Sequence, residues 1–525
     1  MNIAEALGEQ ATARPNVVAI IDTYRGRTRR LTFGELNVAS ARVAALLQEH
    51  GLKPGETVLV FQPLSAELYI ALAGVFRAGL VAMLLDPSVG RSHIERCCQQ
   101  RSPSALIASP RAHLLRVVVP ALRRVPLKLT FGSAVPGAIS LLRDNRAVPA
   151  LAICPCGESA PALVTFTSGS TGGPKAILRS HGFLLAQHRV VARNLELTPG
   201  ESEVATLPVF ILANLASGMT TLVPNVDLRY PGAVDPRPVI DQIDIHQPTR
   251  IAGSPALLER VADYCAGHRR TLDSLRRVYT GGGPVFPRVL RKLRVMAPRA
   301  RVISVYGSTE AEPIAHIDCA DIRDEELEAM TQGSGLLAGK PIAEIQLRIL
   351  PVRWRRPIGP IRDDQFESAC LPPRQVGEIV VSGAHTLPGY LNGQGHENAG
   401  FTVEQTRWHR TGDAGYLDGE GRLWLMGRCA ARIDDALGTL YPFEVECAAL
   451  SYPNVRRAAA VSHQGGRILA VELVGPHKKT DLTFLKSRFL SAHFEVVRVD
   501  RVPVDRRHNV KVDYPALRAI LDSMR

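Results

Sequence analysis

Short apolar runs alternate with segments of helical periodicity along this chain of 525 residues, and this alternation constrains the fold more than any other feature. Residues 36–50 (LNVASARVAALLQEH) carry apolar residues at helical spacing, and residues 56–61 (ETVLVF) follow as a strand. Residues 66–78 predict a second helix, and residues 80–85 predict a strand that ends at Asp86-Pro87. Alternation of this kind is typical of parallel sheets covered by helices.

The same alternation resumes in the middle of the chain, and its texture changes after about Gly339. The expected helices are 239–246, 255–265 and 285–296, and the expected strands are 249–252, 278–280 and 302–305. Short β-rich runs separated by turns then follow, and the segment after Gly427 mixes strands and helices. Since single cores stop growing near ~250–300 residues, we predict an α/β fold with two domains. A large N-terminal domain (1–427) would combine parallel α/β subdomains with a β-rich subdomain, and a small α+β domain would cover 428–525.

Composition is that of an ordinary globular protein, with 46% hydrophobic and 22% charged residues. The nine cysteines follow no visible signal peptide and lack the spacing of a zinc site, so we expect reduced thiols in a cytoplasmic protein. Residues 204–226 contain no charge and are long enough to span a bilayer. Pro208, Asn214, Gly218 and Pro224 interrupt them, which favours a buried strand–loop–helix.

The net charge of +13 leaves several kinds of partner open. The simplest interpretation is a basic surface that faces solvent. More specific interpretations are that the chain binds polyanionic substrates, anionic lipid or an acidic protein. No recognition helix, zinc finger or RNA-binding signature is visible, so we do not expect nucleic acid as a partner.

The most informative segment is 163–175, LVTFTSGSTGGPK. Its apolar strand leads into a loop whose glycines let backbone N–H groups converge on an anion, while hydroxyls and Lys175 add donors and charge. It differs from the P-loop of nucleotide triphosphatases because Pro174 precedes the lysine and Ala176 follows it. A flexible linker is a poor alternative, since apolar strands flank the loop. The predicted phosphate site consists of Thr167, Ser168, Gly169, Ser170, Thr171, Gly172 and Lys175.

This loop resembles the phosphate loop of the adenylate-forming superfamily, which contains acyl- and aryl-CoA synthetases, luciferases and the adenylation domains of peptide synthetases. Further elements that resemble this superfamily follow in the family's order. They are 281–284 (GGGP), 305–310 (VYGSTE), 377–379 (GEI) with 389–390 (GY), 408–413 (WHRTGD) and 427–428 (GR). A single Gly-Arg pair is uninformative, but the ordered series identifies the chain as a member of this superfamily.

The resemblance implies ATP and Mg²⁺ as cofactors and assigns residues to each part of the nucleotide. Tyr306 would stack on adenine, and Asp413 would accept hydrogen bonds from the ribose hydroxyls. Thr309 would donate to the α-phosphate, and Glu310 would be the oxygen ligand of Mg²⁺. The implied adenine and ribose site consists of Gly281, Gly282, Gly283, Tyr306, Gly307, Asp413 and Arg428. Structural alternatives exist for single residues, such as a core tyrosine or a capping threonine.

Residues 506–513 (RRHNVKVD) resemble the family segment whose lysine binds both the substrate carboxylate and the α-phosphate. This implies Lys511 as a catalytic residue beside Thr309 and Glu310, and residues 428–525 as a lid domain. The expected first reaction is attack of a carboxylate on the α-phosphorus, which expels pyrophosphate. Because two anions must approach each other, cations and oriented donors should supply most of the acceleration. The alternative for Lys511 is an ordinary lysine on a basic tail.

In many members the lid then rotates about a hinge and a thiol attacks the adenylate. Here Ala430 replaces the polar hinge residue and Asp434 stands where lysine is usual, which puts thiol transfer in doubt. These departures point to a narrower resemblance, to the β-lactone synthetases of bacterial long-chain olefin biosynthesis. The segments that carry it are 207–210 (LPVF), 223–227 (VPNVD), 427–433, 439–442 (TLYP) and 504–511 (VDRRHNVK).

This narrower resemblance implies a 2-alkyl-3-hydroxy fatty acid substrate, whose own β-hydroxyl displaces AMP to close a β-lactone. A tethered nucleophile offsets part of the ring strain through its high effective molarity. The candidates for accepting the hydroxyl proton are His181, His316, His409 and His508, and the sequence does not choose among them. Residues 204–226 are either a wall of the acyl pocket or plain core.

Three functions therefore stay open. The first is a β-lactone synthetase, and the second is an acyl- or aryl-CoA synthetase or acyl-AMP ligase, which alone would need coenzyme A. The third is a catalytically silent nucleotide- or acyl-binding protein, which the presence of Lys175, Glu310, Asp413 and Lys511 together disfavours. The expected partner is a small β-hydroxy or fatty acid, and a complex with other olefin-pathway enzymes or a peripheral membrane contact stays open.

Overall fold

The computed structural model describes residues 1–85, 90–141, 152–168, 174–354, 356–387, 389–391, 399–474, 482–490, 493–505 and 511–524. The chain divides into two compact units. The first unit comprises residues 1–225, 248–252 and 387–396, and the second comprises residues 226–247, 253–386 and 397–525. The domain boundary expected at Gly427 lies inside the second unit and stays a prediction.

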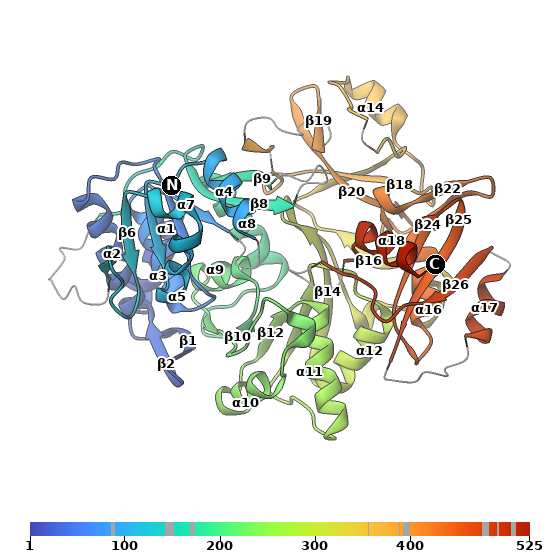
Figure 1. Ribbon diagram of the computed structural model, residues 1–525, viewed down its shortest axis with the longest axis horizontal. Coiled ribbons are helices and arrows are strands. Elements are labelled where there is room, and N and C mark those ends of the chain that lie inside the picture. The colour runs from blue at the N-terminus through green and yellow to red at the C-terminus, as the bar shows by residue number, and fades with distance from the viewer. Residues whose placement is uncertain are drawn as a thin grey trace. The chain divides into compact units, whose positions relative to one another are not determined.

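The first unit contains a seven-stranded sheet, shown in Figure 1. Its strand order is β7 (Ile139–Ser140), β6 (Leu127–Thr130), β5 (Ala105–Ala108), β3 (Thr57–Phe61), β4 (Val81–Leu84), β8 (Pro161–Ser168) and β9 (Pro174–Ser180). Neighbouring strands are parallel except β8 and β9, which form an antiparallel pair. Parallel neighbours need crossover connections, which the intervening helices provide.

Helices cover both faces of this sheet because successive side chains of a strand point to opposite faces. In β3, Val58 and Val60 belong to the core that includes helices α1 (Ile3–Ala13), α2 (Phe33–Glu49) and α3 (Ala66–Arg77). Leu59 and Phe61 belong to a second core, which includes α4 (Arg91–Gln100) and α7 (Pro120–Arg124). The helices and strands expected in this part of the sequence are confirmed, and the expected strand end at Asp86-Pro87 lies outside the described residues.

A second group of strands in the first unit contains the uncharged stretch 204–226. The order is β12 (Arg250–Gly253), β10 (Ser202–Ala205), β11 (Thr220–Leu222), β1 (Val18–Tyr24) and β2 (Arg27–Thr32). Helix α9 (Pro208–Ala216) connects β10 to β11, so the stretch is strand–helix–strand and the expected strand–loop–helix is wrong in order. Gly218, with φ +73°, lets the chain turn back into β11. Within the described residues we find no helix that is both long and apolar enough to cross a membrane.

The second unit begins with parallel pairing and continues as an antiparallel sheet. Its strand order is β13 (Arg277–Gly281), β14 (Arg301–Ser308), β15 (Ala311–Asp318), β16 (Leu336–Pro341), β21 (Leu423–Arg428), β20 (Thr406–Leu417), β18 (Gly377–Ser382) and β17 (Gln346–Leu350). The main helices before β14 are α10 (Arg237–His246), α11 (Pro255–Gly267) and α12 (Pro287–Met296). These bounds confirm the helices and strands expected between Asp235 and Val305 and the β-rich segment after Gly339.

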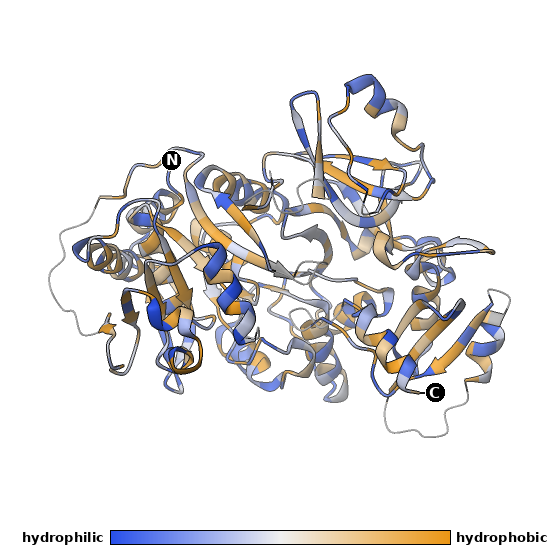
Figure 2. Cartoon of the chain, turned by 45° about the horizontal axis from the view of Figure 1, so that its top comes forward, coloured by the Kyte–Doolittle hydropathy of each residue, from blue (hydrophilic) through white to orange (hydrophobic). Residues whose placement is uncertain are grey.

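The C-terminal part of the second unit has its own sheet and core. Strands β24 (Val455–His463), β25 (Gly466–Leu473) and β26 (Phe494–Arg498) pack with α16 (Pro442–Leu450) and α17 (Thr483–Leu490), and α18 (Tyr514–Ser523) follows. The strands of this sheet and of the large sheets are mostly hydrophobic, as Figure 2 shows. The predicted α/β class, with a β-rich part and an α+β C-terminal part, is confirmed.

A buried charge cluster fixes β10 beside β12 in the first unit. The guanidinium of Arg250 is fully buried, and its Nε lies 3.2 Å from Glu203 Oε2. The same guanidinium donates to the carbonyl oxygens of Leu195, at 2.6 Å, and Glu196, at 2.9 Å. Burial raises the pKa of Glu203, and the charge of Arg250 opposes this shift. The stability of this buried cluster therefore depends on the presence of both Arg250 and Glu203.

Replacing Arg250 with methionine should strongly destabilise the first unit, because Glu203 would stay buried without its counter-charge. We expect a loss of about 3–5 kcal/mol in the free energy of unfolding, measured by urea denaturation. The double variant Arg250→Met with Glu203→Leu should recover most of the loss, since no buried charge would remain. Equal destabilisation of the single and double variants would contradict this role for the pair.

Candidate active site

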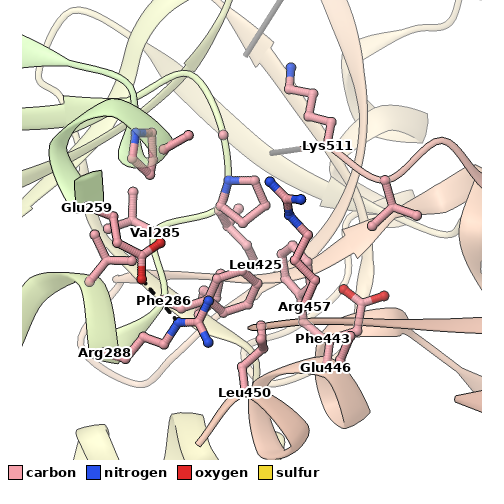
Figure 3. A pocket seen from close by; sticks show the side chains of 18 of the residues that line it. Glu259, Val285, Phe286, Arg288, Leu425, Phe443, Glu446, Leu450, Arg457 and Lys511 are labelled. Atoms are coloured by element: carbon pink, nitrogen blue, oxygen red, sulfur yellow. Dashed lines mark ion pairs between the residues drawn. The ribbon is translucent and has the colours of Figure 1, made fainter. Parts of the chain in front are cut away.

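A cavity of about 1070 Å³ lies in the second unit, and Figure 3 shows part of its wall. Most of the predicted adenine and ribose residues line it. Strand ends, loops and the C-terminal segment all contribute to its wall. The predicted residues that line it are Gly282, Gly283, Tyr306, Gly307, Asp413, Arg428 and Lys511. Residues that are distant in the sequence thus meet at one cavity.

The carboxylate of Asp413 is the centre of the polar contacts in this cavity. Tyr306 donates its hydroxyl to Asp413 Oδ2 at 2.9 Å, and Arg428 donates from Nη1 to Asp413 Oδ1 at 2.8 Å. The amide N–H of Asp413 donates to Thr411 Oγ1 at 3.0 Å. Each carboxylate oxygen has two acceptor positions, so both oxygens can accept a further hydrogen bond from a ligand hydroxyl.

A buried ion pair connects the strand that carries Asp413, β20, to its neighbour β18. Arg410 and Glu378 are almost completely buried, with Arg410 Nη2 2.5 Å from Glu378 Oε2. Arg410 also donates to the carbonyl oxygens of Arg353 and Arg356, each at 2.8 Å. These bonds attach the loop after β17 to the strand of Asp413.

That loop brings Trp354 against the turn before Asp413. Gly412 has φ +69°, and a Cβ there would lie 3.0 Å from the Trp354 ring. Only glycine satisfies both conditions at this position. Trp354 belongs to none of the family's motifs, so its position against Gly412 could not be expected from the sequence.

The predicted glycine turn follows the close pairing of β13 with β14. Gly281 pairs with Val305, and a Cβ on Gly281 would lie 2.5 Å from the Val305 carbonyl oxygen. Gly282, with φ +82°, then turns the chain into the cavity wall. A side chain at Gly281 would therefore push the two strands apart.

Thr309 and Glu310 lie in the turn between β14 and β15, and neither lines the cavity. The amide N–H groups of Glu310 and Ala311 both donate to Ser308 Oγ at 3.3 Å, which shapes this turn. Burial lowers the pKa of His409, and the Glu310 carboxylate opposes the shift. The predicted roles of Thr309 and Glu310 stay predictions.

Lys511 reaches the cavity from the C-terminal segment (Figure 3). Its backbone is paired with Asp505, because Lys511 N–H donates to Asp505 Oδ1 and Asp505 N–H donates to the Lys511 carbonyl, each at 2.8 Å. Glu446 lies at the same wall, where it accepts from the Ala460 amide at 3.0 Å and the Tyr514 hydroxyl at 3.3 Å. Burial raises the pKa of Glu446 to about 7.

The cavity also contains a group of cations that the sequence did not single out. Arg288 donates to the carbonyl oxygens of Val455 and Arg456, and its Nε lies 3.6 Å from Glu259 Oε1 (Figure 3). Burial lowers the pKa of Arg457. The basic side chains of this group are Arg260, Arg288, Arg291, Lys292, Arg456 and Arg457. Arginines are scattered through the whole sequence, so nothing distinguished these before the fold was known.

The predicted phosphate loop belongs to the first unit. It connects the antiparallel strands β8 and β9, in which Thr167 pairs with Lys175 and Ser168 with Pro174. Lys175 Nζ lies 5.2 Å from the centre of the Tyr390 ring. The expectation of apolar flanking strands is confirmed, and Gly169, Ser170, Thr171 and Gly172 lie outside the described residues.

Of the histidine candidates, none lines the cavity among the described residues. His181 accepts the amide N–H of Ile3 on Nδ1 at 3.2 Å, and burial lowers its pKa to about 4. His409 is buried in β20, His316 lies on β15, and His508 lies outside the described residues. The proton acceptor for a lactonisation step stays open.

The hinge region after Arg428 contains a small hairpin. Asp434 lies on β22 (Ile433–Asp435), opposite Thr439 of β23 (Gly438–Leu440). Its carboxylate accepts from Arg432 Nε at 2.7 Å and from Thr439 Oγ1 at 2.8 Å. The residue that replaces the family's usual lysine is thus engaged within its own hairpin.

The chain is similar to known proteins over most of its length. Residues 7–391 match the family model described as AMP-binding enzyme. The olefin beta-lactone synthetase of Xanthomonas campestris pv. campestris is 30% identical, and that of Stenotrophomonas maltophilia is 31% identical; each alignment covers 97% of this chain and 96% of the relative. The crystal structure of the anthranilate CoA ligase AuaEII with anthranoyl-AMP has the same fold, with a TM-score of 0.82 at 18% identity over 100% of this chain and 98% of that one.

The family model covers most of the chain, and both relatives align over nearly their whole length. The chain therefore belongs to the AMP-binding enzyme family, and it is an AMP-forming acid ligase or synthetase that activates its substrate as an acyl-adenylate.

Proposed function

We propose that the cavity of the second unit binds the nucleotide and that Lys511 completes it for adenylate formation. The observation that carries this proposal is the meeting of Tyr306, Asp413, Arg428 and Lys511 at one cavity. The Tyr306 ring would face adenine, and the Asp413 oxygens would accept the ribose hydroxyls. Residues 428–525 would act as the lid that delivers Lys511, in a protein that works in the cytoplasm.

In the first step a substrate carboxylate oxygen bonds to the α-phosphorus, and the bond to the β-phosphate breaks to release pyrophosphate. Repulsion between two unit anions 4 Å apart amounts to about 4 kcal/mol at an effective dielectric constant of 20. The ammonium of Lys511 would offset this repulsion, because it lines the cavity on a backbone paired to Asp505. Acidic partners offset part of the charge of the other basic side chains on the wall, since Lys292 Nζ lies 2.8 Å from both Glu259 Oε1 and Asp263 Oδ1.

Magnesium would be held by Glu310 together with the phosphates of ATP, and the ion would neutralise charge on those phosphates. In the described part of the chain, no three His, Cys, Asp or Glu side chains gather as a metal site. Mg²⁺ usually binds through one or two carboxylates, substrate phosphates and water. Glu310 would supply one such carboxylate from the turn between β14 and β15.

For the second step we favour lactone formation from a 2-alkyl-3-hydroxy fatty acid. The β-hydroxyl oxygen would bond to the acyl carbon, the acyl–phosphate bond would break, and AMP would leave while a base takes the hydroxyl proton. Support comes from the similarity to olefin beta-lactone synthetases over 97% of the chain. Further support comes from the hinge, where Asp434 is engaged by Arg432 and Thr439.

The alternative is transfer of the acyl group to the thiol of coenzyme A. It is favoured by the hinge segment Tyr441–Glu444, where Glu444 accepts the Tyr441 amide N–H at 2.7 Å. This capping arrangement involves the part of the hinge pattern that the chain shares with thiol-using relatives. Product analysis separates the two second steps.

Replacing Asp413 with asparagine should weaken ATP binding by roughly 10–100-fold, because hydrogen bonds to a charged acceptor contribute about 1.5–3 kcal/mol. Tyr306→Phe is the matched variant, since it removes the hydroxyl bound to Asp413 and keeps the ring. We expect a loss of about tenfold or less for Tyr306→Phe. Calorimetric titration with ATP and Mg²⁺ measures both, and unchanged affinity in Asp413→Asn would refute the ribose assignment.

Replacing Lys511 with alanine should lower ATP–pyrophosphate exchange by ~10²-fold or more, as expected for loss of one transition-state contact. Lys486→Ala is the control, because Lys486 is an exposed lysine of α17 in the same C-terminal part. It should exchange pyrophosphate at the wild-type rate. An equal rate in Lys511→Ala would mean that this lysine lies outside the reaction.

Product mass with a long-chain 2-alkyl-3-hydroxy acid, ATP and Mg²⁺ should correspond to the acid minus water, with one AMP released. Omission of coenzyme A should leave the yield unchanged, because the nucleophile is part of the substrate. The acid without its 3-hydroxyl is the control and should give no lactone. A thioester that requires coenzyme A would select the alternative, and absence of AMP would contradict both.

A further inference from the structure

A short helical stretch in the first unit directs hydrophobic side chains into solvent. Helices α5 (Pro110–His113) and α6 (Leu115–Val118) are joined by Leu114, whose φ of −61° and ψ of −27° are also helical. The Ser109 hydroxyl caps the stretch by accepting the Ala112 amide N–H at 3.3 Å. Residues 110–118 therefore follow one nearly continuous helical path between β5 and β6 of the chain.

The outward face of this helix is apolar. Leu114, Val117 and Val118 are 68%, 77% and 50% exposed. Their spacing of three and four residues places them on one face. On the inward face, His113 lies 3.0 Å through Nε2 from the Leu129 carbonyl oxygen, and Leu115 packs against the core of the sheet. These contacts of the inward face hold the helix against the sheet. The exposed apolar face takes no part in that packing.

The surrounding chain is cationic. No Asp or Glu occurs in the sequence between Glu95 and Asp144. Arg111 lies on α5, and Arg123 and Arg124 lie on α7, which packs against α6 and α4. All three arginines are exposed. An apolar face beside a stretch of sequence that is basic and lacks acidic residues differs from an ordinary solvated surface, where apolar residues are scattered singly.

We infer that the helical face Leu114–Val118 and the arginines of α7 form a docking surface for an anionic lipid membrane. Leu114, Val117 and Val118 would enter the boundary between headgroups and acyl chains, while Arg111, Arg123 and Arg124 bind lipid phosphates. Both the apolar and the cationic parts fit such a surface. Lipid binding here does not depend on the proposed second step of catalysis, because none of these residues lines the cavity.

Vesicle co-sedimentation tests this surface with the full-length protein. Wild-type protein should sediment with vesicles of phosphatidylcholine mixed with phosphatidylglycerol, and far less with phosphatidylcholine alone. Added salt should weaken the binding, because screening reduces the arginine contribution. Leu114→Ser with Val117→Ser and Val118→Ser should lower binding at least ~10-fold, and Arg123→Glu with Arg124→Glu should do the same.

Matched controls come from the second unit. Ile245→Ser with Val295→Ser removes apolar residues that are 69% and 66% exposed, and Arg269→Glu with Arg299→Glu removes exposed cations. Both controls should bind anionic vesicles like the wild type, and unchanged melting temperatures confirm folding of each variant. Failure of the wild type to bind these vesicles, or wild-type binding by both test variants, would overturn the inference. Self-association of the wild type that the serine variant abolishes would instead assign the face to a second copy and also overturn it.

Discussion

The hydrogen bonds of Asp413 connect three strands at the cavity of the second unit. Its two oxygens accept from Tyr306 on β14 and from Arg428 at the end of β21, while Asp413 itself lies on β20. A carboxylate shared by a phenol and a guanidinium loses much rotational freedom, so its remaining acceptor positions are directed before a ligand arrives. The buried ion pair of Arg410 and Glu378 also restricts the position of Asp413, because Arg410 lies on the same strand. Pre-organisation of this kind lowers the entropic cost of binding.

The cavity of the second unit brings together basic residues that lie far apart in the sequence. A carboxylate and a triphosphate repel each other, and one cation on a flexible surface would be screened by water and salt. In the second unit, Lys511 and several arginines line one concave wall, where the protein excludes part of the solvent. Charges placed in such a site act more strongly than in water and need no rearrangement during the reaction. Under the proposed function, these basic residues would lie where the two anions approach each other.

Much of the fold followed from periodicity, because helices and strands differ in the spacing of apolar residues. Helix α3 and strand β3 are buried along their whole length, so the length of each apolar run and the turn-forming residues at its ends made them predictable. The stretch 204–226 was harder, because its apolar residues suit a strand and a helix equally, and its second strand β11 depends on pairing with β10 and β1.

Some residues of the candidate site could likewise be predicted from the sequence, and others could not. Tyr306, Asp413, Arg428 and Lys511 belong to short motifs, so their residue types and order were visible in the sequence. Trp354 was not, because its place depends on bonds from Arg410 to the carbonyl oxygens of a loop. Such contacts end on backbone carbonyl oxygens, which every residue has, so the residues that accept them show no sequence signature.

The most direct measurement follows the carboxylate oxygens during turnover. An acid substrate whose carboxylate carries the heavy oxygen isotope is incubated with ATP and Mg²⁺, and the AMP is analysed by mass spectrometry. Attack of the carboxylate on the α-phosphorus predicts AMP with one heavy oxygen, whether the acyl group ends in a lactone or a thioester. AMP without the isotope, or ADP and phosphate as products, would contradict activation through an acyl-adenylate.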